Sequence, residues 1–309
     1  MRGVVHFSVT VTSGRAEQHS GMDGKRSQHE PLKDLTALLA ELSGPTARGI
    51  EVPNFLQAIK VTNTKWEDAQ YEYIANTLMQ GHPEIKSKDA FIASLEHRWQ
   101  QPNLTVHQIS VPDSKTAVTI SGSAQATFSI RIVPDQTADS VALATSDFLQ
   151  HSFEKIGGRN KLEIKITSMA DPWLADPEQE PFNTFKSAIV DVWYPQEDST
   201  ALRSFPAISS SRDPAVAPNF RQNRPTHRRA SSLATRGFFN VDNTARGPLF
   251  IREGGSIPAL RILEKEFKAK AVMFPMGQAS DNAHLFQERM RVENLYKGKE
   301  VLKKVFSEL

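Results

Sequence analysis

The sequence predicts an α+β fold in which a four-stranded antiparallel sheet carries two helices on one face. Residues 3–12 (GVVHFSVTVT) alternate apolar and polar side chains, the two-residue period of a half-buried strand. The elements predicted over 1–180 follow in the order strand, helix, strand, strand, helix, strand, which is the order of the split βαβ motif. A strand–helix–strand pattern near residue 260 indicates a second part of α/β type over 181–309.

Local patterns supply the other elements of the first part. A helix predicted over 31–42 has one apolar face, formed by Leu32, Leu35, Leu38, Leu39 and Leu42. A helix over 137–155 ends just before Gly157, the residue type that most often follows a helix end. The other predicted elements are a loop over 17–22, strands over 103–111, 124–133 and 161–168, and helical pieces near 66–79 and 88–98 within an insertion of about 50–100.

The α/β pattern spans 249–274. It predicts two short strands, 249–251 and 271–274, joined by a glycine turn and an amphipathic helix for which Ser256 is the expected N-cap. The apolar face of this helix is formed by Ile257, Leu260, Leu263 and Phe267. Unpaired N–H groups at the helix start make an anion site beside Gly255 and Ser256. The alternative is an ordinary α/β scaffold without a site.

The rest of the second part is predicted from composition and periodicity. A helix is expected over 183–193, with Phe185, Ile189 and Val190 as its apolar side, and another over 292–306, with Leu295, Val301, Leu302 and Val305 covering a sheet. Between them, 196–246 is rich in Ser, Arg, Pro and Asn and poor in aliphatic residues, so we expect a disordered insertion there.

Composition limits the classes of function. The formal net charge of +2 gives no reason to expect a nucleic-acid partner, and no apolar run approaches membrane-spanning length. The absence of cysteine excludes disulfides and thiolate ligands, so a zinc site would have to use histidines and carboxylates. We expect a soluble cytoplasmic protein.

Two motifs resemble a known family. Residues 252–258 (REGGSIP) and 277–284 (GQASDNAH) are similar to the C-terminal signature of the two-zinc metallopeptidases that include the carnosine dipeptidases and aminoacylases. Within that family, the residues of the two motifs are most similar to the branch that contains the peptidase-like subunit of the fungal glutathione-degrading complex. This resemblance implies that 1–180 is a lid, or dimerisation, domain and that 181–309 is the C-terminal part of a catalytic domain. It also implies a homodimer formed through the lid, a possible glutamine amidotransferase-like partner subunit, and a small peptide as substrate.

The resemblance assigns a metal ligand. His284 matches the last metal ligand of the family, with Asp281 placed to orient it and Glu288 matching a glutamate that follows it; Gln287 replaces the family's usual asparagine. A lone loop histidine is otherwise more often solvated.

The resemblance also assigns substrate-binding and catalytic residues. Arg131, on an otherwise apolar strand, would bind the substrate carboxylate; the alternative is a structural salt bridge. Gly255 and Ser256 would add substrate contacts. His19 would act in catalysis, because the family's matching histidine reaches from the lid of one subunit into the active site of its partner. Without the resemblance, His19 would be an ordinary loop residue. Thr119 is a further substrate-binding candidate, although Val118-Thr119 stands where the family has Thr-Val.

A two-zinc hydrolase needs further ligands and a glutamate base. The family carries these in a His-x-Asp motif, a single Asp, a Glu-Glu pair and a further Asp, and this chain has no His-x-Asp and no adjacent Glu-Glu. We therefore expect no peptide hydrolysis by the chain alone. Three interpretations remain: part of a longer peptidase whose parent hydrolyses glutathione or Cys-Gly, a non-catalytic dimerising subunit that docks an amidotransferase-like partner, and a plain α+β interaction module.

Overall fold

The computed structural model describes residues 1–23, 30–46, 49–57, 59, 70–76, 85–112, 117–195 and 248–308. These residues belong to two compact units. Unit 1 comprises Met1–Pro181 and Leu249–Met273, and unit 2 comprises Phe182–Pro248 and Phe274–Leu309. The predicted disordered insertion, 196–246, lies outside the described residues, as does most of the helical piece expected near 66–79, of which 70–76 is helical.

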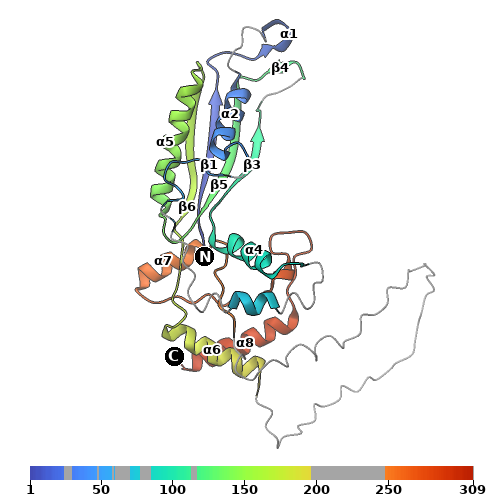
Figure 1. The fold of residues 1–309 in the computed structure, drawn as a ribbon, viewed down its shortest axis with the longest axis vertical. Coiled ribbons are helices and arrows are strands. Elements are labelled where there is room, and N and C mark those ends of the chain that lie inside the picture. Colours follow the sequence, from blue (N-terminus) through green and yellow to red (C-terminus); the bar gives the residue numbers. More distant parts are fainter. Residues whose placement is uncertain are drawn as a thin grey trace, which may run out of the picture. The chain divides into compact units, whose positions relative to one another are not determined.

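Unit 1 is built on a four-stranded antiparallel sheet, as predicted (Figure 1). Its strand order is β3-β5-β1-β6. The strands are β1 (Gly3–Thr12), β3 (Asn103–Ser110), β5 (Ser123–Ile132) and β6 (Lys161–Ala170). Strand β1 lies in the centre because it pairs with both β5 and β6, and the two edges are β3 and β6.

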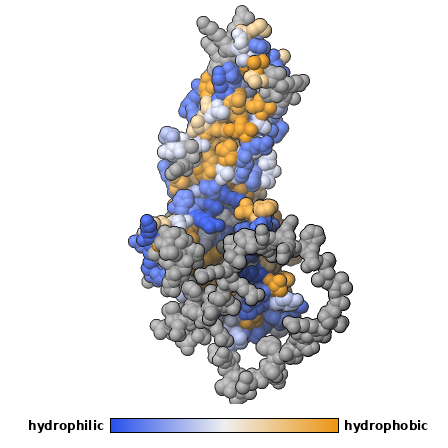
Figure 2. Space-filling view, turned by 90° about the vertical axis from the view of Figure 1, so that its right-hand side faces the viewer, coloured by the Kyte–Doolittle hydropathy of each residue, from blue (hydrophilic) through white to orange (hydrophobic). Residues whose placement is uncertain are grey.

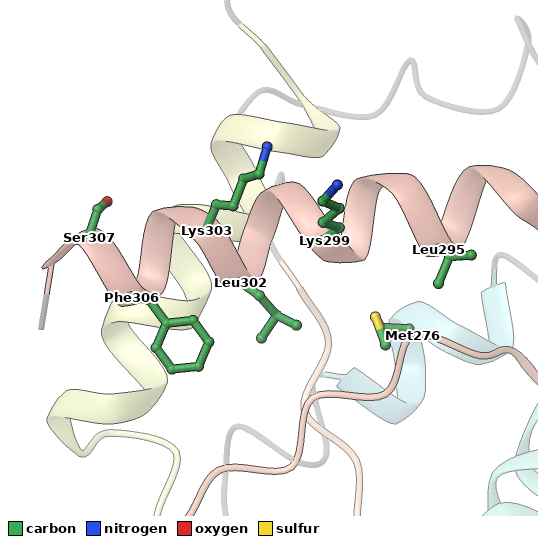
Figure 3. Close-up of a pocket in the computed structure, with 7 residues that line it drawn as sticks. All are labelled: Met276, Leu295, Lys299, Leu302, Lys303, Phe306 and Ser307. Carbon is green, nitrogen blue, oxygen red and sulfur yellow. The ribbon is translucent and has the colours of Figure 1, made fainter.

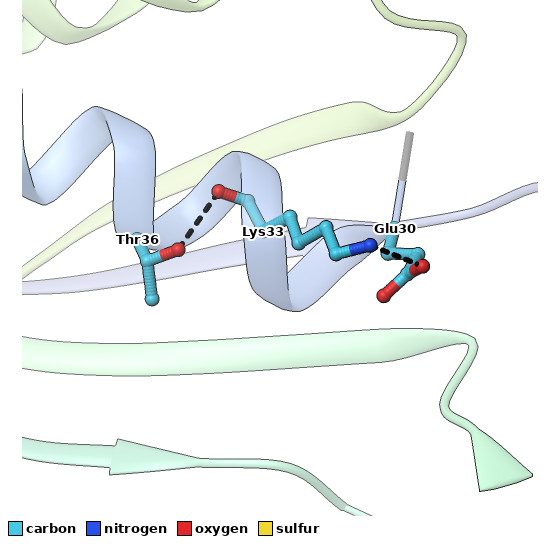
Figure 4. Close-up of polar contacts among 3 residues, drawn as sticks. All are labelled: Glu30, Lys33 and Thr36. Carbon is cyan, nitrogen blue, oxygen red and sulfur yellow. Dashed lines mark hydrogen bonds and ion pairs between the residues drawn. The ribbon is translucent and has the colours of Figure 1, made fainter. Parts of the chain in front are cut away.

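Two helices, α2 (Pro31–Ser43) and α5 (Ala138–Ile156), cover one face of this sheet. The Thr137 side chain caps the start of α5 by accepting from the Ser140 N–H, and Gly157 ends it with a positive φ of 70°, a conformation that glycine adopts without strain. In α2, Lys33 pairs with Glu30 at 2.6 Å and the Thr36 hydroxyl donates to the Lys33 carbonyl at 2.9 Å (Figure 4). Leu32 is exposed, so the predicted apolar face of α2 is narrower than expected.

The core of unit 1 lies between the sheet and these helices. Phe7 of β1 and Phe128 of β5 are directly opposite each other and stack with ring centroids 4.9 Å apart. Odd-numbered residues of β1 and even-numbered residues of β5 are buried against the helices. The alternate residues face away from them and are mostly polar, because successive side chains of a strand point to opposite faces.

The loop predicted over 17–22 has local structure. Residues Gln18–His19 form the short strand β2, which pairs with β4 (Thr119–Ile120), and Ser20–Asp23 form the helical turn α1. In Figure 1, β4 and α1 lie at the end of the sheet remote from the N-terminus. The loop prediction was wrong because strand pairing over two residues depends on a partner a hundred residues away, which no local pattern reveals.

The α/β prediction for 249–274 was confirmed for its helix and wrong for its two strands. Helix α7 (Pro258–Phe267) forms, but 249–251 and 271–274 are not strands, and no residue of α7 is buried. A strand needs a hydrogen-bonded neighbour, and no strand of the described residues pairs with either segment. The N-cap of α7 is Ile257, without a side-chain cap, because the Ser256 hydroxyl bonds elsewhere.

Helix α4 (Lys88–Gln100) agrees with the piece predicted over 88–98. It starts at Ser87, whose hydroxyl accepts from the Ala90 N–H, the bond typical of an N-cap. Near its end, Gln100 donates to the Tyr71 hydroxyl, and the rings of Trp99 and Tyr71 stack. Residues 70–76 are therefore anchored to the C-terminal end of α4.

Unit 2 contains all but the first two residues of α6 (Glu180–Trp193), together with the 3₁₀ turn η1 (Ala279–Asp281) and α8 (Val292–Glu308). Val301 and Val305 of α8 pack with Ala188 of α6, so α8 covers a helix rather than a sheet, contrary to the prediction. Another side of α8 borders a shallow apolar hollow, in which Leu302 and Phe306 lie on the side of Met276 while Lys303 points away (Figure 3). None of the helices in the described part of the chain has the length and apolar composition needed to cross a lipid bilayer.

Candidate functional site

Arg131 and Ser256 meet in unit 1, although 125 residues separate them in the sequence. Arg131 is opposite Val4 in the β1–β5 pair and lies on the face of the sheet that the helices leave free. Its Nη1 donates to the Ser256 Oγ at 2.6 Å, and that hydroxyl donates in turn to the Arg2 carbonyl oxygen at 2.7 Å. The serine therefore fixes one arm of the guanidinium against β1.

Arg2 holds the glycine turn in place, a role that sequence reasoning missed. Its Nε donates to the Gly254 carbonyl, and its Nη1 donates to the Gln101 carbonyl and the Asn103 Oδ1, each at 2.8 Å. A Cβ on Gly254 would lie 2.5 Å from the Arg98 carbonyl oxygen, so only glycine fits this close approach. The alternation of β1 is the signal that could have placed Arg2 on the same face as Arg131.

Two guanidinium groups, those of Arg2 and Arg131, act on each other at this point, and Glu253 is the acid that acts on Arg2. Burial lowers the pKa of Arg2 and Arg131 lowers it further, while Glu253 opposes this by raising it. Among the described residues Arg131 forms no ion pair, so the structural salt bridge considered for it is not found there. A guanidinium has five N–H donors, and the Ser256 hydroxyl accepts only one of them. The remaining donors can bind a carboxylate.

Gly255 has a different partner from the one expected. Its N–H donates to the Glu253 Oε1 at 3.0 Å, so a side chain of the chain itself already occupies this donor. The predicted substrate contact from Gly255 requires Glu253 to move.

His19 and Thr119 are directly opposite each other in the β2–β4 pair. The His19 Nδ1 accepts from the Gly21 N–H at 3.2 Å, and the His19 N–H donates to the Asp23 Oδ2 at 3.2 Å. Because Nδ1 is an acceptor, the proton of the neutral ring is on Nε2. The exposed imidazole therefore presents an N–H donor.

Arg131 lies near one end of the four-stranded sheet, and the separate β2–β4 pair that carries His19 and Thr119 lies beyond its other end. Strand β5 runs from Ser123, beside β4, to Ile132, and Arg131 is eight residues from Ser123. At about 3.3 Å per residue, that separation is roughly 26 Å. His19 and Thr119 therefore do not reach Arg131 within one copy of unit 1.

His284 lies in unit 2, in the turn after η1, where it is exposed and has a positive φ of 64°. Asp281 is buried and its Oδ2 accepts from the Gln278 N–H at 2.9 Å, while its Oδ1 has no hydrogen-bond partner among the described residues. No hydrogen bond joins Asp281 to His284 there. Glu288 is exposed, and Gln287 also has a positive φ of 60°.

The described residues do not fit a zinc site by themselves. No group of three or more His, Asp or Glu side chains in this part of the chain lies close enough to hold a metal ion. A catalytic zinc needs three protein ligands, and His284 supplies one at most.

The curated proteins that this chain resembles are named as peptidases of short peptides. No protein-family model matches the chain. It is 27% identical over 311 residues to the probable di- and tripeptidase DUG2 of Saccharomyces cerevisiae, covering 100% of this chain and 28% of the relative. It is 26% identical over 306 residues to the Cys-Gly metallodipeptidase dug1 of Schizosaccharomyces pombe, covering 96% of this chain and 52% of the relative. The chain thus spans about half, or less, of the length of these curated relatives.

Solved structures share the fold. The dipeptidase Dug1p of Saccharomyces cerevisiae matches 100% of this chain with a TM-score of 0.69 and 22% identity, over 55% of its own length. Human carnosine dipeptidase 1 matches 99% of this chain with a TM-score of 0.65 and 24% identity, over 54% of its own length. A metallo-carboxypeptidase of the M20 family from Sulfolobus solfataricus matches 99% of this chain with a TM-score of 0.64 and 14% identity, over 58% of its own length.

Proposed function

Because this chain is a homologue of the dipeptidases of the M20 metallopeptidase family, we propose that it supplies the substrate-carboxylate site of a zinc dipeptidase. The substrate class is small peptides with a free C-terminal carboxylate, such as Cys-Gly or glutathione. In this proposal 1–180 is the lid and 181–309 is the C-terminal part of a catalytic domain. The observation that best supports it is the 2.6 Å contact between Arg131 and Ser256, two residues that the family resemblance names independently.

The geometry gives Arg131 and Ser256 distinct roles. A carboxylate binds two parallel N–H donors of a guanidinium, and such a bidentate pair fixes its orientation. Ser256 holds the guanidinium from the side of β1, so the planar fork has little freedom when the substrate arrives. The scissile bond of the peptide would then lie at a fixed distance from its bound carboxylate.

His19 and Thr119 would serve a second copy of the chain. Their separation of roughly 26 Å or more from Arg131 excludes a shared site within one copy and supports a site shared between two. The N–H that His19 presents through Nε2 suits the stabilisation of an oxyanion.

The β3 edge of the sheet is the proposed contact between two copies. Strand β3 (NLTVHQIS) carries no Lys, Arg, Asp or Glu, and its Val106 and Ile109 are exposed beside a groove that α2 and α5 also line. Figure 2 shows apolar surface along unit 1 on this side. The opposite edge, β6, carries Lys161, Glu163 and Lys165, and charged side chains discourage edge-to-edge pairing.

We propose no hydrolysis by this chain alone, since its described residues do not make a metal site. The absence of a metal site among the described residues also supports a second candidate function. In this alternative the chain is a non-catalytic, dimerising subunit that docks an amidotransferase-like partner. Incubation of the chain with Zn²⁺ and Cys-Gly distinguishes an active enzyme from both candidates. Release of glycine above the buffer rate would show that the chain is a complete peptidase.

Binding of Cys-Gly and of its C-terminal amide tests the carboxylate site. The chain has no cysteine, so a reductant that protects the peptide leaves the protein unchanged. We expect the free acid to bind about tenfold or more tightly than the amide, since hydrogen bonds to charged groups are worth about 1.5–3 kcal/mol. Arg131→Met should abolish this preference, whereas Arg159→Met, which removes an exposed arginine, should keep it. Equal affinity for acid and amide in the unaltered chain would refute the proposed site.

A further inference from the structure

Two histidines lie beside Arg131 on the helix-free face of the sheet. His6 of β1 is directly opposite Ser129 of β5, two residues from Arg131 on the same strand. The imidazole of His107 on β3 stacks on that of His6, with ring centroids 6.0 Å apart and an interplanar angle of 24°. The three side chains thus belong to adjacent strands and share one face, because residues two apart on a strand point the same way.

The hydrogen bonds of the pair leave most of its ring nitrogens free. The His107 Nε2 and the Ser129 Oγ are 2.8 Å apart, which fixes the position of one ring. Among the described residues, the His107 Nδ1 and both ring nitrogens of His6 have no hydrogen-bond partner, and neither histidine forms an ion pair. Ser129 is buried, so it positions His107 without facing solvent itself.

The charged groups around His6 are mostly positive. Burial lowers the pKa of His6, and His107 and Arg131 lower it further. Arg2 lies on the same face of β1, four residues away. On β6 the charged groups of this region are Lys165 and Glu163, which pair with each other at 2.8 Å. Glu253 acts on Arg2, but the two stacked imidazoles form no ion pair among the described residues, so a bound anion would favour the charged form of His6.

From this arrangement we propose that His6 and His107 form a second anion subsite, next to the carboxylate site of Arg131. It rests on the proposed function and adds to it a preference, among small peptides, for those that carry a second carboxylate besides the C-terminal one. Arg131 binds the C-terminal carboxylate, and the imidazole pair binds the second carboxylate, with His6 taking up a proton as it does so. A peptide with one carboxylate leaves the pair without an anion, so the pKa of His6 stays below its ordinary value.

The peptides Ala-Glu and Ala-Gln test this subsite, because they have nearly the same shape and differ by one negative charge. NMR titration of the chain with each peptide follows the Arg131 Nε–H and the ring signals of His6 and His107 separately. We expect both peptides to shift the Arg131 signal and only Ala-Glu to shift the two histidines and raise the pKa of His6. The affinity ratio of Ala-Glu to Ala-Gln should be about fivefold at pH 6 and close to one at pH 8, since partly exposed charge pairs contribute up to about 1 kcal/mol.

Variants separate the subsite from the carboxylate site. The double variant H6Q/H107Q should bind both peptides equally at pH 6 while the Arg131 signal still responds, and H151Q, which alters an exposed histidine on α5, should keep the ratio. An Arg131 response to both peptides with equal affinities in the unaltered chain, or a ratio that survives in H6Q/H107Q, would overturn the subsite and leave the carboxylate site standing. No Arg131 response to either peptide would overturn both.

Discussion

His19 and Thr119 are opposite each other across the β2–β4 pair, at the end of the sheet farthest from Arg131. His19 had been expected in a loop, and Thr119 stands in a Val-Thr pair where the family usually has Thr-Val. Their pairing places a histidine and a threonine side by side on neighbouring strands. This arrangement has a function only if another molecule approaches that end of the sheet, and a second copy of the chain is the partner that the proposed site requires.

The first prediction concerns that dimer. Ile109 on β3 is 46% exposed and Ile166 on β6 is 44% exposed, so both tolerate a lysine in the monomer equally well. If the β3 edge forms the contact, Ile109→Lys should convert a dimer to a monomer in light scattering at micromolar concentration, because a buried, unpaired charge is costly. Ile166→Lys serves as the matched control and should remain dimeric. A monomeric mass for the unaltered chain would rule out the dimer altogether.

The second prediction concerns local stability. The central strands β1 and β5 are buried along their length, whereas α7 has no buried residue and α8 has Gly298, Val301 and Val305. Amide groups of elements with few buried contacts exchange through local opening. Hydrogen exchange should therefore be slow in β1 and β5 and fast in 249–274 and α8. Equal protection of these regions and the central strands would contradict this expectation.

Much of unit 1 could be predicted because its signals are local. The alternation in 3–12 defines β1 to the residue, and Thr137 and Gly157 mark the ends of α5 by their side-chain and backbone chemistry. The predicted four-stranded antiparallel sheet follows from the number and order of the elements along the chain, without knowledge of any long-range contact.

The errors arose where contacts with residues far away in the sequence determine the local structure. Ser256 has the type of an N-cap, but its hydroxyl bonds to the Arg2 carbonyl and the Arg131 guanidinium, which lie far away in the sequence. The segments 249–251 and 271–274 have the apolar composition of strands but no strand beside them in the described residues.

The candidate site could be predicted only in part. Arg131 attracted attention as a charge on an apolar strand, and the structure adds that its partner is Ser256. The His6–His107 stack could not be predicted because the bulge between Val106 and Gln108 changes the register of β3, and no periodic pattern reveals a bulge.

The third prediction concerns the Ser256 hydroxyl. Ser256→Ala removes one donor and one acceptor and leaves the Arg2 carbonyl and the Arg131 Nη1 without this partner. We expect a loss of about 1–2 kcal/mol in the free energy of unfolding, measured with urea, since partly buried hydrogen bonds contribute about 1 kcal/mol each. Thr36→Ala removes an exposed hydroxyl bond within α2 and is expected to change stability by less than about 0.5 kcal/mol. Similar losses in the two variants would mean that the Ser256 network does not hold unit 1 together.

The fourth prediction concerns pH and His6. Burial, His107 and Arg131 disfavour the charged imidazole, so the pKa of His6 is lower in the folded chain than in the unfolded chain. As the pH falls below about 6.5, the unfolded chain takes up a proton that the folded chain does not, and the free energy of unfolding decreases until the folded pKa is reached. The stabilisation that a neutral His6 allows is thus fully present above the unfolded pKa.

Urea unfolding of the unaltered chain, His6→Gln and His151→Gln across this pH range measures the effect. His6→Gln should lose less stability on acidification than the unaltered chain, because glutamine does not titrate. His151 is exposed on α5, away from the helix-free face, and its replacement should leave the pH dependence as it was. If His6→Gln and the unaltered chain lose the same stability between about pH 7 and pH 5, the folded chain does not hold His6 uncharged, and the charge linkage between the imidazole pair and Arg131 is absent.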